Sequence, residues 1–186
     1  MQGFSCPSCS NKGVLVQVAQ NIPLFGHLVI QTFSCKHCGF KLNDVMEAEF
    51  HAPTRLEVRV NGKEDLNVKI VRNSSATIEI PELGAKVEPG PASMGFYTNA
   101  EGLLERVGDA LNVLLNSAKG KELDTAVKVL EDLSQCRQGK KPFTVVLWDP
   151  YGNSKLLGSR VVERPLSEEE TRNLKKSVQL FESEKK

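Results

Sequence analysis

The sequence is poor in aromatic residues and histidines, and its charges nearly cancel. Phe, Trp and Tyr make up 6% of the 186 residues, and 24 Lys and Arg stand against 23 Asp and Glu, for a net charge of +1. A chain so close to neutrality has no global field that would attract a polyanion. No apolar run approaches the roughly 20 residues that cross a bilayer. The apolar content of 40% is ordinary for a globular protein, so we expect one large or two small folded domains.

Recognisable catalytic motifs are also missing. The three histidines, His27, His37 and His51, are scattered, and neither HxH nor HExxH occurs. GxSxG, P-loop and GxGxxG sequences are absent as well. Asp149 and Glu101 could form an acid–base pair, but Asp149 suits a turn before a proline and Glu101 suits a helix cap. The residues therefore give little support to an enzyme.

Four of the five cysteines form two CxxC pairs. Cys6 and Cys9 are separated by 25 residues from Cys35 and Cys38, which leaves room for a β-hairpin that folds the second pair back onto the first. Four thiolates satisfy tetrahedral Zn²⁺ and leave no open position, so this pattern predicts one structural zinc ion. Cys136 is expected to stay a reduced thiol.

Disulfides and a redox CxxC are the alternatives to zinc. Disulfides need an oxidising compartment, and no signal peptide is recognisable before Cys6. A redox CxxC would open a helix, whereas Cys9 is followed by the turn-forming residues 10–13. We therefore favour zinc in a cytoplasmic protein, with His37 as a solvent-facing residue rather than a ligand.

The elements around the cysteines predict a zinc ribbon over residues 1–45. Alternation at residues 14–18 and the apolar residues of 27–33 indicate the two strands of a hairpin. Gly39 is expected to adopt φ > 0 after the second CxxC. The hairpin tip is apolar, and its side chains either contact a partner or pack on the rest of the chain: Ile22, Pro23, Leu24 and Phe25.

Residues 46–166 predict a β-rich domain with a helical hairpin inserted at about 99–138. Strands are expected at 55–60, 66–71, 76–80, 143–148, 155–157 and 160–163, and Asn61-Gly62 predicts a β-hairpin. A capping box at Thr98 to Glu101 opens the first helix, and Gly120 separates it from the second. A second capping box, Ser167 to Glu170, opens a C-terminal helix in residues 167–186.

Several ordered motifs resemble the ZPR-type zinc-finger family, whose eukaryotic members bind translation elongation factor 1-alpha. Besides the CxxC-x25-CxxC spacing and the hairpin segment, they are NSSATIEIPEL at 73–83, EGLL at 101–104, FTVV at 143–146 and DPYGNS at 149–154. The resemblance covers Phe4 to Leu157 and is to the single-module, archaeal-type members. It implies a mainly β fold with α-helices: a zinc ribbon, a β-rich domain like a double-stranded β-helix with a helical-hairpin insertion, and a C-terminal helix.

The resemblance also implies a function. We expect a non-enzymatic zinc-binding adaptor or folding factor whose partner is a GTPase of the elongation factor 1-alpha type. Beyond the hairpin tip, the family motifs suggest further partner contacts at Asn73, Ser74, Ser75, Asp149 and Asn153. The alternatives are a nucleic-acid-binding zinc ribbon, which the near-neutral charge and the lack of an Arg-rich run disfavour, and a small-molecule site in the β-rich domain.

Overall fold

The computed structural model describes residues 4–22, 26–47, 51–90, 93 and 95–183, and it divides the chain into two compact units. The first unit, residues 1–50, is called the ribbon unit here. The second, residues 51–186, is called the β-domain.

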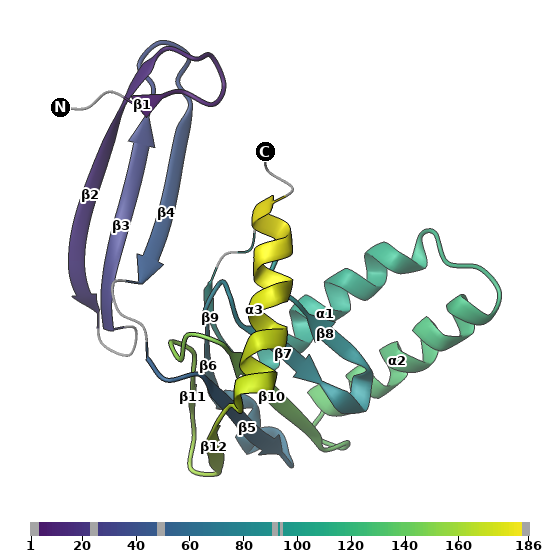
Figure 1. Cartoon of the computed structure of the whole chain (residues 1–186). Coiled ribbons are helices and arrows are strands. Elements are labelled where there is room, and N and C mark those ends of the chain that lie inside the picture. The colour runs from purple at the N-terminus through teal and green to yellow at the C-terminus, as the bar shows by residue number, and fades with distance from the viewer. Residues whose placement is uncertain (1–3, 23–25, 48–50, 91–92, 94, 184–186) are drawn as a thin grey trace. The chain divides into compact units, whose positions relative to one another are not determined.

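The ribbon unit is a four-stranded antiparallel sheet in the order β1-β2-β3-β4. Its strands are β1 (Phe4–Ser5), β2 (Lys12–Ile22), β3 (Gly26–Ser34) and β4 (Lys41–Glu47). Strands β2 and β3 form the expected hairpin, with Val14 opposite Ser34 and Ile22 opposite Gly26. The third long strand, β4, pairs with β3 and adds to the hairpin that the sequence indicated (Figure 1).

The β-domain is built on two antiparallel sheets. The five-stranded sheet has the order β12-β5-β10-β7-β8, and the three-stranded sheet has the order β11-β6-β9. The bounds of these strands are β5 (Thr54–Val60), β6 (Lys69–Arg72), β7 (Thr77–Ile80), β8 (Ala85–Val87), β9 (Phe96–Asn99), β10 (Phe143–Asp149), β11 (Lys155–Leu157) and β12 (Val161–Pro165). Two 3₁₀ helices, η1 (Lys63–Asn67) and η2 (Pro81–Leu83), lie between strands.

Strand alternation places one face of each strand in a common core. On β5, Leu56, Val58 and Val60 are buried, while the charged residues between them face outward, as the pattern predicted. The core joins both sheets, which are called the sandwich here, to the base of the helical hairpin at residues 100–107 and 133–136. Its fully buried residues include Ile70, Ile78, Leu103, Leu104, Phe143, Val145 and Leu147. The predicted mainly β fold with α-helices, a ribbon of antiparallel strands followed by a β-rich domain with a helical-hairpin insertion, is confirmed.

Two local predictions are wrong. Asn61-Gly62 does not form a hairpin, because β5 pairs with β10 and β12 while the chain after Gly62 enters η1. The backbone amide of Asn61 instead donates to Asp65 Oδ2 at 2.8 Å. The first helix is capped by Asn99 rather than Thr98, since the Asn99 side chain accepts a hydrogen bond from the Gly102 amide at 2.9 Å.

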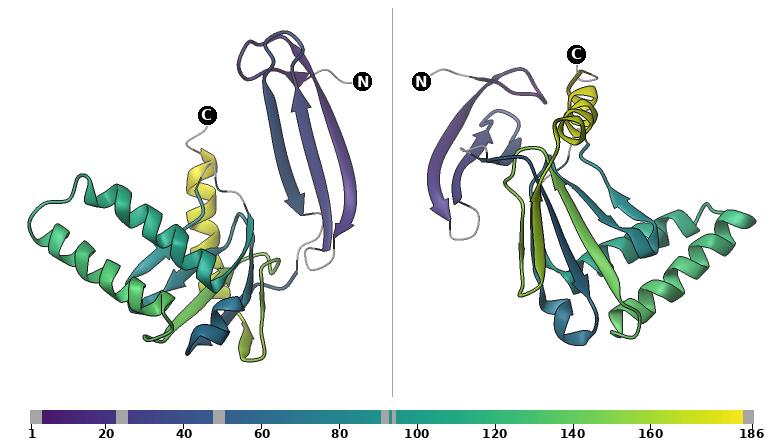
Figure 2. Two further views of the ribbon diagram at one scale, coloured as in Figure 1. Left: turned by 180° about the vertical axis from the view of Figure 1, so that it is seen from behind. Right: turned by 60° about the horizontal axis from the view of Figure 1, so that its bottom comes forward.

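The helical hairpin consists of α1 (Ala100–Leu115) and α2 (Lys121–Arg137). It leaves the sandwich at Asn99 and extends away from both sheets, as two views show (Figures 1 and 2). The C-terminal helix α3 (Glu168–Ser183) begins with the predicted capping box: the Glu170 amide donates to Ser167 Oγ, and the Ser167 amide donates to Glu170 Oε2. Within the described part of the chain, no helix combines the length and apolarity needed to cross a membrane.

Burial distinguishes the two ends of α1, which gives a matched stability test. Leu104 is 0% exposed, and replacing it with Ala should lower the free energy of unfolding of the β-domain by about 2–5 kcal/mol because a cavity is left in the core. Leu114 lies on the same helix and is 59% exposed, so Leu114→Ala should change it by less than about 0.5 kcal/mol. Urea unfolding followed by circular dichroism measures both, and equal losses would contradict this assignment of the core.

Candidate metal centre and interaction surfaces

Both CxxC pairs sit in turns of the same construction. The Cys6 amide donates to Asn11 O at 2.8 Å and the Ser10 amide to Cys6 O at 2.9 Å. The second turn repeats this, with Cys35 N to Phe40 O at 2.9 Å and Gly39 N to Cys35 O at 3.0 Å. The residue after each second cysteine has a positive φ, 60° at Ser10 and 74° at Gly39, so the expectation for Gly39 is met. Each turn therefore directs its two sulfur atoms to the same side.

The four sulfur atoms form a compact group. Cys6 Sγ lies 3.6 Å from Cys38 Sγ, Cys9 Sγ lies 3.7 Å from Cys35 Sγ, and all four ligand atoms lie within 4.8 Å of one another. A tetrahedron with Zn–S bonds of about 2.3 Å has S–S edges of about 3.8 Å. The donor set and its spacing thus fit one Zn²⁺ ion, with four sulfur ligands and no position left for water or substrate.

At two of the four cysteines the pKa is lowered, chiefly by a hydrogen bond from a backbone amide. The Asn11 amide lowers the pKa of the Cys9 thiol to about 7, and the Cys38 amide lowers the pKa of Cys35. At Cys38, the lowering by the Phe40 amide is outweighed by hydrogen bonds with the other thiols and by burial, so its pKa rises to about 11. Zinc is bound by thiolates, so its binding would release the protons that the cysteines carry without it.

A small apolar cluster surrounds the sulfurs. Phe33 is buried with Cys6 and Cys35, and its ring centroid lies 6.2 Å from that of Phe40. Gly13 makes room for this ring, because a Cβ at residue 13 would overlap the Phe33 side chain. His37 is exposed in the second turn and is outside the group of possible metal ligands.

The predicted contacts at the hairpin tip cannot be placed. Pro23, Leu24 and Phe25 lie outside the described residues, as does the side chain of Ile22. Their role in partner binding therefore stays a prediction.

The loops of the other predicted contacts lie next to each other. The Asn73 amide donates to Ser154 Oγ at 3.0 Å, which joins residues 73–75 to the loop of residues 149–154. Asn73 Oδ1 accepts from the Ser75 amide and the Ser75 hydroxyl, both at 2.8 Å. Ser74 is exposed, whereas Asn153 is buried.

Asp149 shapes its own loop. Its side chain is 0% exposed, and its Oδ1 accepts from the amides of Tyr151 and Gly152 at 2.8 and 3.0 Å. Oδ2 accepts from the amides of Asn153 and Ser154 at 2.9 and 2.6 Å. The turn predicted at Asp149 is present. A partner would meet the outside of this loop rather than the carboxylate.

The distal half of the helical hairpin exposes large apolar side chains. Along the predicted stripe of α1, Leu104 and Val107 are buried, whereas Leu114 is 59% exposed and its neighbour Val113 is 70% exposed. On α2, Leu123 and Val127 are also exposed. The apolar periodicity of the sequence continues along the whole of each helix. It therefore did not indicate which part of the helical hairpin is buried and which part is exposed.

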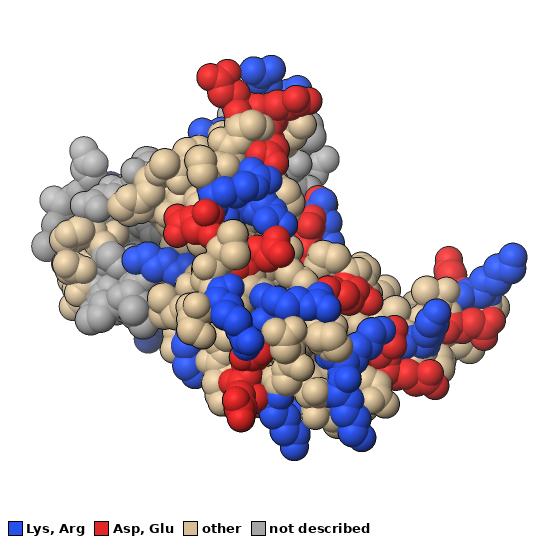
Figure 3. Space-filling model, turned by 90° about the horizontal axis from the view of Figure 1, so that it is seen from below, with Lys and Arg blue, Asp and Glu red and all other residues tan. Residues whose placement is uncertain are grey.

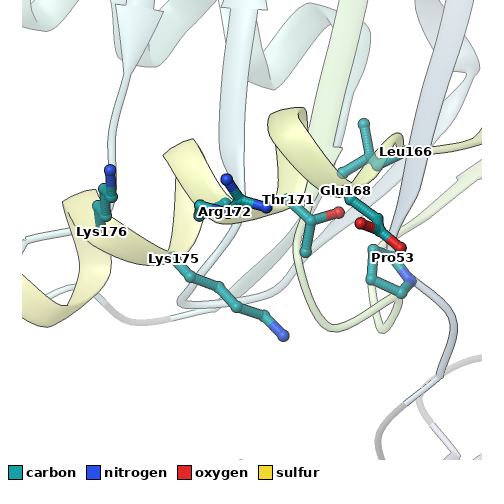
Figure 4. Close-up of a pocket in the computed structure, with 7 residues that line it drawn as sticks. All are labelled: Pro53, Leu166, Glu168, Thr171, Arg172, Lys175 and Lys176. Carbon is teal, nitrogen blue, oxygen red and sulfur yellow. The ribbon is translucent and has the colours of Figure 1, made fainter.

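An open cleft lies beside α3 (Figure 4). It is lined by Pro53, Leu166, Glu168, Thr171, Arg172, Lys175 and Lys176. Lys175 also lies 5.1 Å from the Tyr151 ring, and Glu170 pairs with Arg164, so these side chains attach α3 to the loop after β10 and to β12. The cleft brings together one carboxylate, one hydroxyl and three cations.

Comparisons with known proteins cover nearly the whole chain. Residues 1–52 match the ZPR1 zinc-finger domain, and residues 64–178 match the ZPR1 jelly-roll domain. The match therefore extends beyond Leu157 and includes most of α3, which the motifs alone had not reached.

Relatives come from archaea and eukaryotes. A ZPR1-like protein of Pyrococcus horikoshii is 42% identical over 92% of this chain and 79% of its own length, and one of Methanocaldococcus jannaschii is 37% identical over 98% and 93%. The zinc finger chaperone zpr1 of Schizosaccharomyces pombe is 33% identical over 80% of this chain but only 33% of its own length.

The first test of the metal centre is the loss of one ligand. Cys35→Ser should abolish the binding of one zinc per chain, because three thiolates hold the ion far less well than four. Metal analysis of the purified protein measures the stoichiometry. Cys136→Ser is the control, since Cys136 is buried in the β-domain and should leave the zinc content unchanged.

The second test removes the metal from the intact chain. Chelation should unfold the ribbon unit and leave the β-domain folded, because the β-domain has its own apolar core and the ribbon unit has only a small one. Hydrogen exchange should then show protection retained in β5 and β10 and lost in β2 and β3. A single cooperative collapse of both units would contradict this expectation.

Proposed function

This chain belongs to the ZPR1 zinc-finger family, and on that premise we propose that it is a non-enzymatic adaptor or folding factor that binds a GTPase of the elongation factor 1-alpha type. The closed four-cysteine site fits a structural role for the metal, because four sulfur ligands leave no position for substrate. The name of the Schizosaccharomyces pombe relative, a zinc finger chaperone, supports a role in protein folding. The GTPase as partner follows from the family resemblance.

The observation that carries a protein-binding function is the exposed apolar surface on the helical hairpin. Val113 and Leu114 lie in the last turn of α1, Leu123 and Val127 lie in the first half of α2, and all four are exposed. Figure 1 shows the end of the hairpin where the two helices are connected extending away from the sheets. Several large apolar side chains exposed at one end of a helical hairpin support an interaction site there. A protruding helical pair can insert into a groove of a partner without rearrangement of the sandwich.

The charges of the described residues favour a protein partner over nucleic acid. On the face shown in Figure 3, Lys and Arg lie among Asp and Glu rather than forming a continuous basic surface. Arg59 pairs with Glu82, and Lys141 Nζ lies 2.7 Å from Asp132 Oδ1. Cations engaged in this way are less available to phosphates, which dominate nucleic-acid affinity.

Further contacts are proposed at the positions that the family motifs marked. In the ribbon unit these are Ile22 to Phe25, and in the β-domain they are the adjoining loops of residues 73–75 and 149–154, where Ser74 is exposed. Such a protein would act in the cytoplasm, where its GTPase partner is made.

The test measures binding of the full zinc-loaded chain to elongation factor 1-alpha of the same organism by isothermal titration calorimetry. Leu114→Asp should raise the Kd by about tenfold or more, because it places a charge in an apolar contact. Asn112→Asp is the matched control, since residue 112 is exposed on the same helix and the same charge is introduced. It should leave the Kd nearly unchanged.

Salt dependence separates the two candidate functions. When salt is raised from about 50 to about 200 mM, an apolar protein interface should keep most of its affinity. Binding that depends on phosphate contacts should lose about 10³-fold or more in affinity over the same range. If the chain does not bind the GTPase at any salt concentration, the proposed function is overturned. If Leu114→Asp and Asn112→Asp weaken binding equally, the proposed contact at Leu114 is overturned.

A further inference from the structure

The cleft beside α3 concentrates positive charge that the chain as a whole does not have. Three cations and one carboxylate line it, which gives a local charge of +2, whereas the net charge of the complete sequence is +1. Its volume is about 610 Å³, which is the size of a site for several side chains rather than for a single ion. The cleft is therefore a candidate binding site for a negatively charged ligand of some size.

The cations of the cleft share one face of α3. Lys175 and Lys176 follow Arg172 at spacings of three and four, which places the three side chains next to each other on a helix. Figure 4 shows Lys176 at one end of the cleft, Pro53 and Leu166 at the other, and Arg172 and Lys175 between them. A ligand that lies along this face would meet several positive charges in succession.

The cations of the cleft are also available to a ligand. Several other cations of the β-domain already pair with carboxylates: Arg59 with Glu82, Lys141 with Asp132, Arg160 with Asp65 and Arg164 with Glu170. Arg172 and Lys176 are exposed, and neither forms an ion pair with any residue that the structure describes. Lys175 lies over the Tyr151 ring, a contact that holds its ammonium group in place without neutralising it.

One end of the cleft is apolar. Pro53 and Leu166 are half-buried, and the Leu166 amide donates to Pro53 O at 3.0 Å, which holds the two residues together where β5 begins and β12 ends. An inorganic anion would gain nothing from these side chains. A ligand that carries both negative charges and an apolar group would use the whole cleft.

The cleft adjoins the loop of residues 149–154. The His51 amide donates to Tyr151 O at 2.8 Å, and the chain passes so close to Gly152 that a Cβ there would overlap Ala52 O. Pro53 follows directly, so the floor of the cleft continues into this loop. A partner that contacts the outside of the loop would therefore reach the cations of α3 as well.

We propose that the cleft binds a short acidic segment of a partner protein. Carboxylates of the segment pair with Arg172, Lys175 and Lys176, and an apolar side chain of the segment packs on Pro53 and Leu166. The proposal goes beyond the GTPase as partner and is tested without it.

A peptide fits this cleft better than a nucleic acid does. Nucleic-acid binding depends on a series of phosphate contacts along a basic surface. Here the first turn of α3 is acidic at residues 168–170, so the basic surface ends within the length of the cleft. A short segment needs no longer surface, and its backbone amides can donate to the Glu168 carboxylate.

Fluorescence polarisation of labelled peptides with the full zinc-loaded chain, at about 100 mM salt, tests the proposal. The acidic peptide GEELDELEG should bind with a Kd below about 1 mM. Its amide counterpart GQQLNQLQG should bind about tenfold more weakly or worse, because the charges are removed while the leucines are kept. GEESDESEG, which has serine in place of leucine, should bind about fivefold more weakly, because it loses the apolar contact.

Variants of α3 test the site. R172E/K176E should bind GEELDELEG about tenfold more weakly or worse, because two attractive charges become repulsive. K121E/K128E is the matched control: both lysines are exposed on α2, outside the cleft, and the net charge changes equally, so its Kd should stay within about twofold of the wild type. E168Q should bind about threefold more tightly, since Glu168 lies four residues before Arg172 and competes for its guanidinium group.

A reversed charge pattern gives the sharpest result. R172E/K176E should gain affinity for the basic peptide GKKLKKLKG relative to both the wild type and K121E/K128E. Melting temperatures show that each variant is folded. The proposal is overturned if the wild-type chain does not bind GEELDELEG, if both double variants lose affinity equally, or if no gain for the basic peptide is seen. Oligouridine that displaces GEELDELEG and binds more tightly would overturn it in favour of a nucleic acid.

Discussion

Strand β10 pairs with β5 along its whole length, from Phe143 opposite Val60 to Asp149 opposite Thr54. The two strands lie far apart in the sequence, and each also pairs with a further strand, β10 with β7 and β5 with β12. Their inward faces are buried, and apart from Thr54 and Asp149 at one end they are apolar. The second sheet and the helical hairpin are formed by the chain between β5 and β10 and just after β10, and the final helix follows β12. The register of β5 and β10 therefore fixes where these segments begin and end.

The end of this pair is also where the loops of the β-domain are fixed. Asp149 is the last residue of β10, and its carboxylate accepts four backbone amides, which satisfies a buried charge and sets the path of residues 151–154. Ser154 then holds the amide of Asn73, which starts the neighbouring loop. The nearby buried Arg72, stacked over Phe96, supplies a positive charge to the same region. Loop geometry on this surface is therefore set from inside the domain.

Local chemistry predicted those parts of the fold that local interactions decide. The CxxC turns, the buried alternation of β5, the turn at Asp149 and the capping box at Ser167 each depend on residues close in sequence. The hairpin at Asn61-Gly62 failed because the long-range pairing of β5 with β10 outweighs a favourable turn. The extent of the exposed apolar stripe was not predictable either, since helical periodicity shows which face is apolar but not how far the sandwich reaches along it.

The two units keep their folds by different means, and this difference explains where their apolar side chains can go. In the β-domain, strand faces are held together by burial, so Leu56, Ile78 and Leu147 must lie inside. In the ribbon unit, the buried apolar residues among those described are Phe33 and the cysteines Cys6 and Cys35. Four thiolates around one ion supply the closure that a larger core would otherwise provide. Val14, Val16 and Val18 are therefore not needed inside, and the ribbon sheet can expose them without losing its fold.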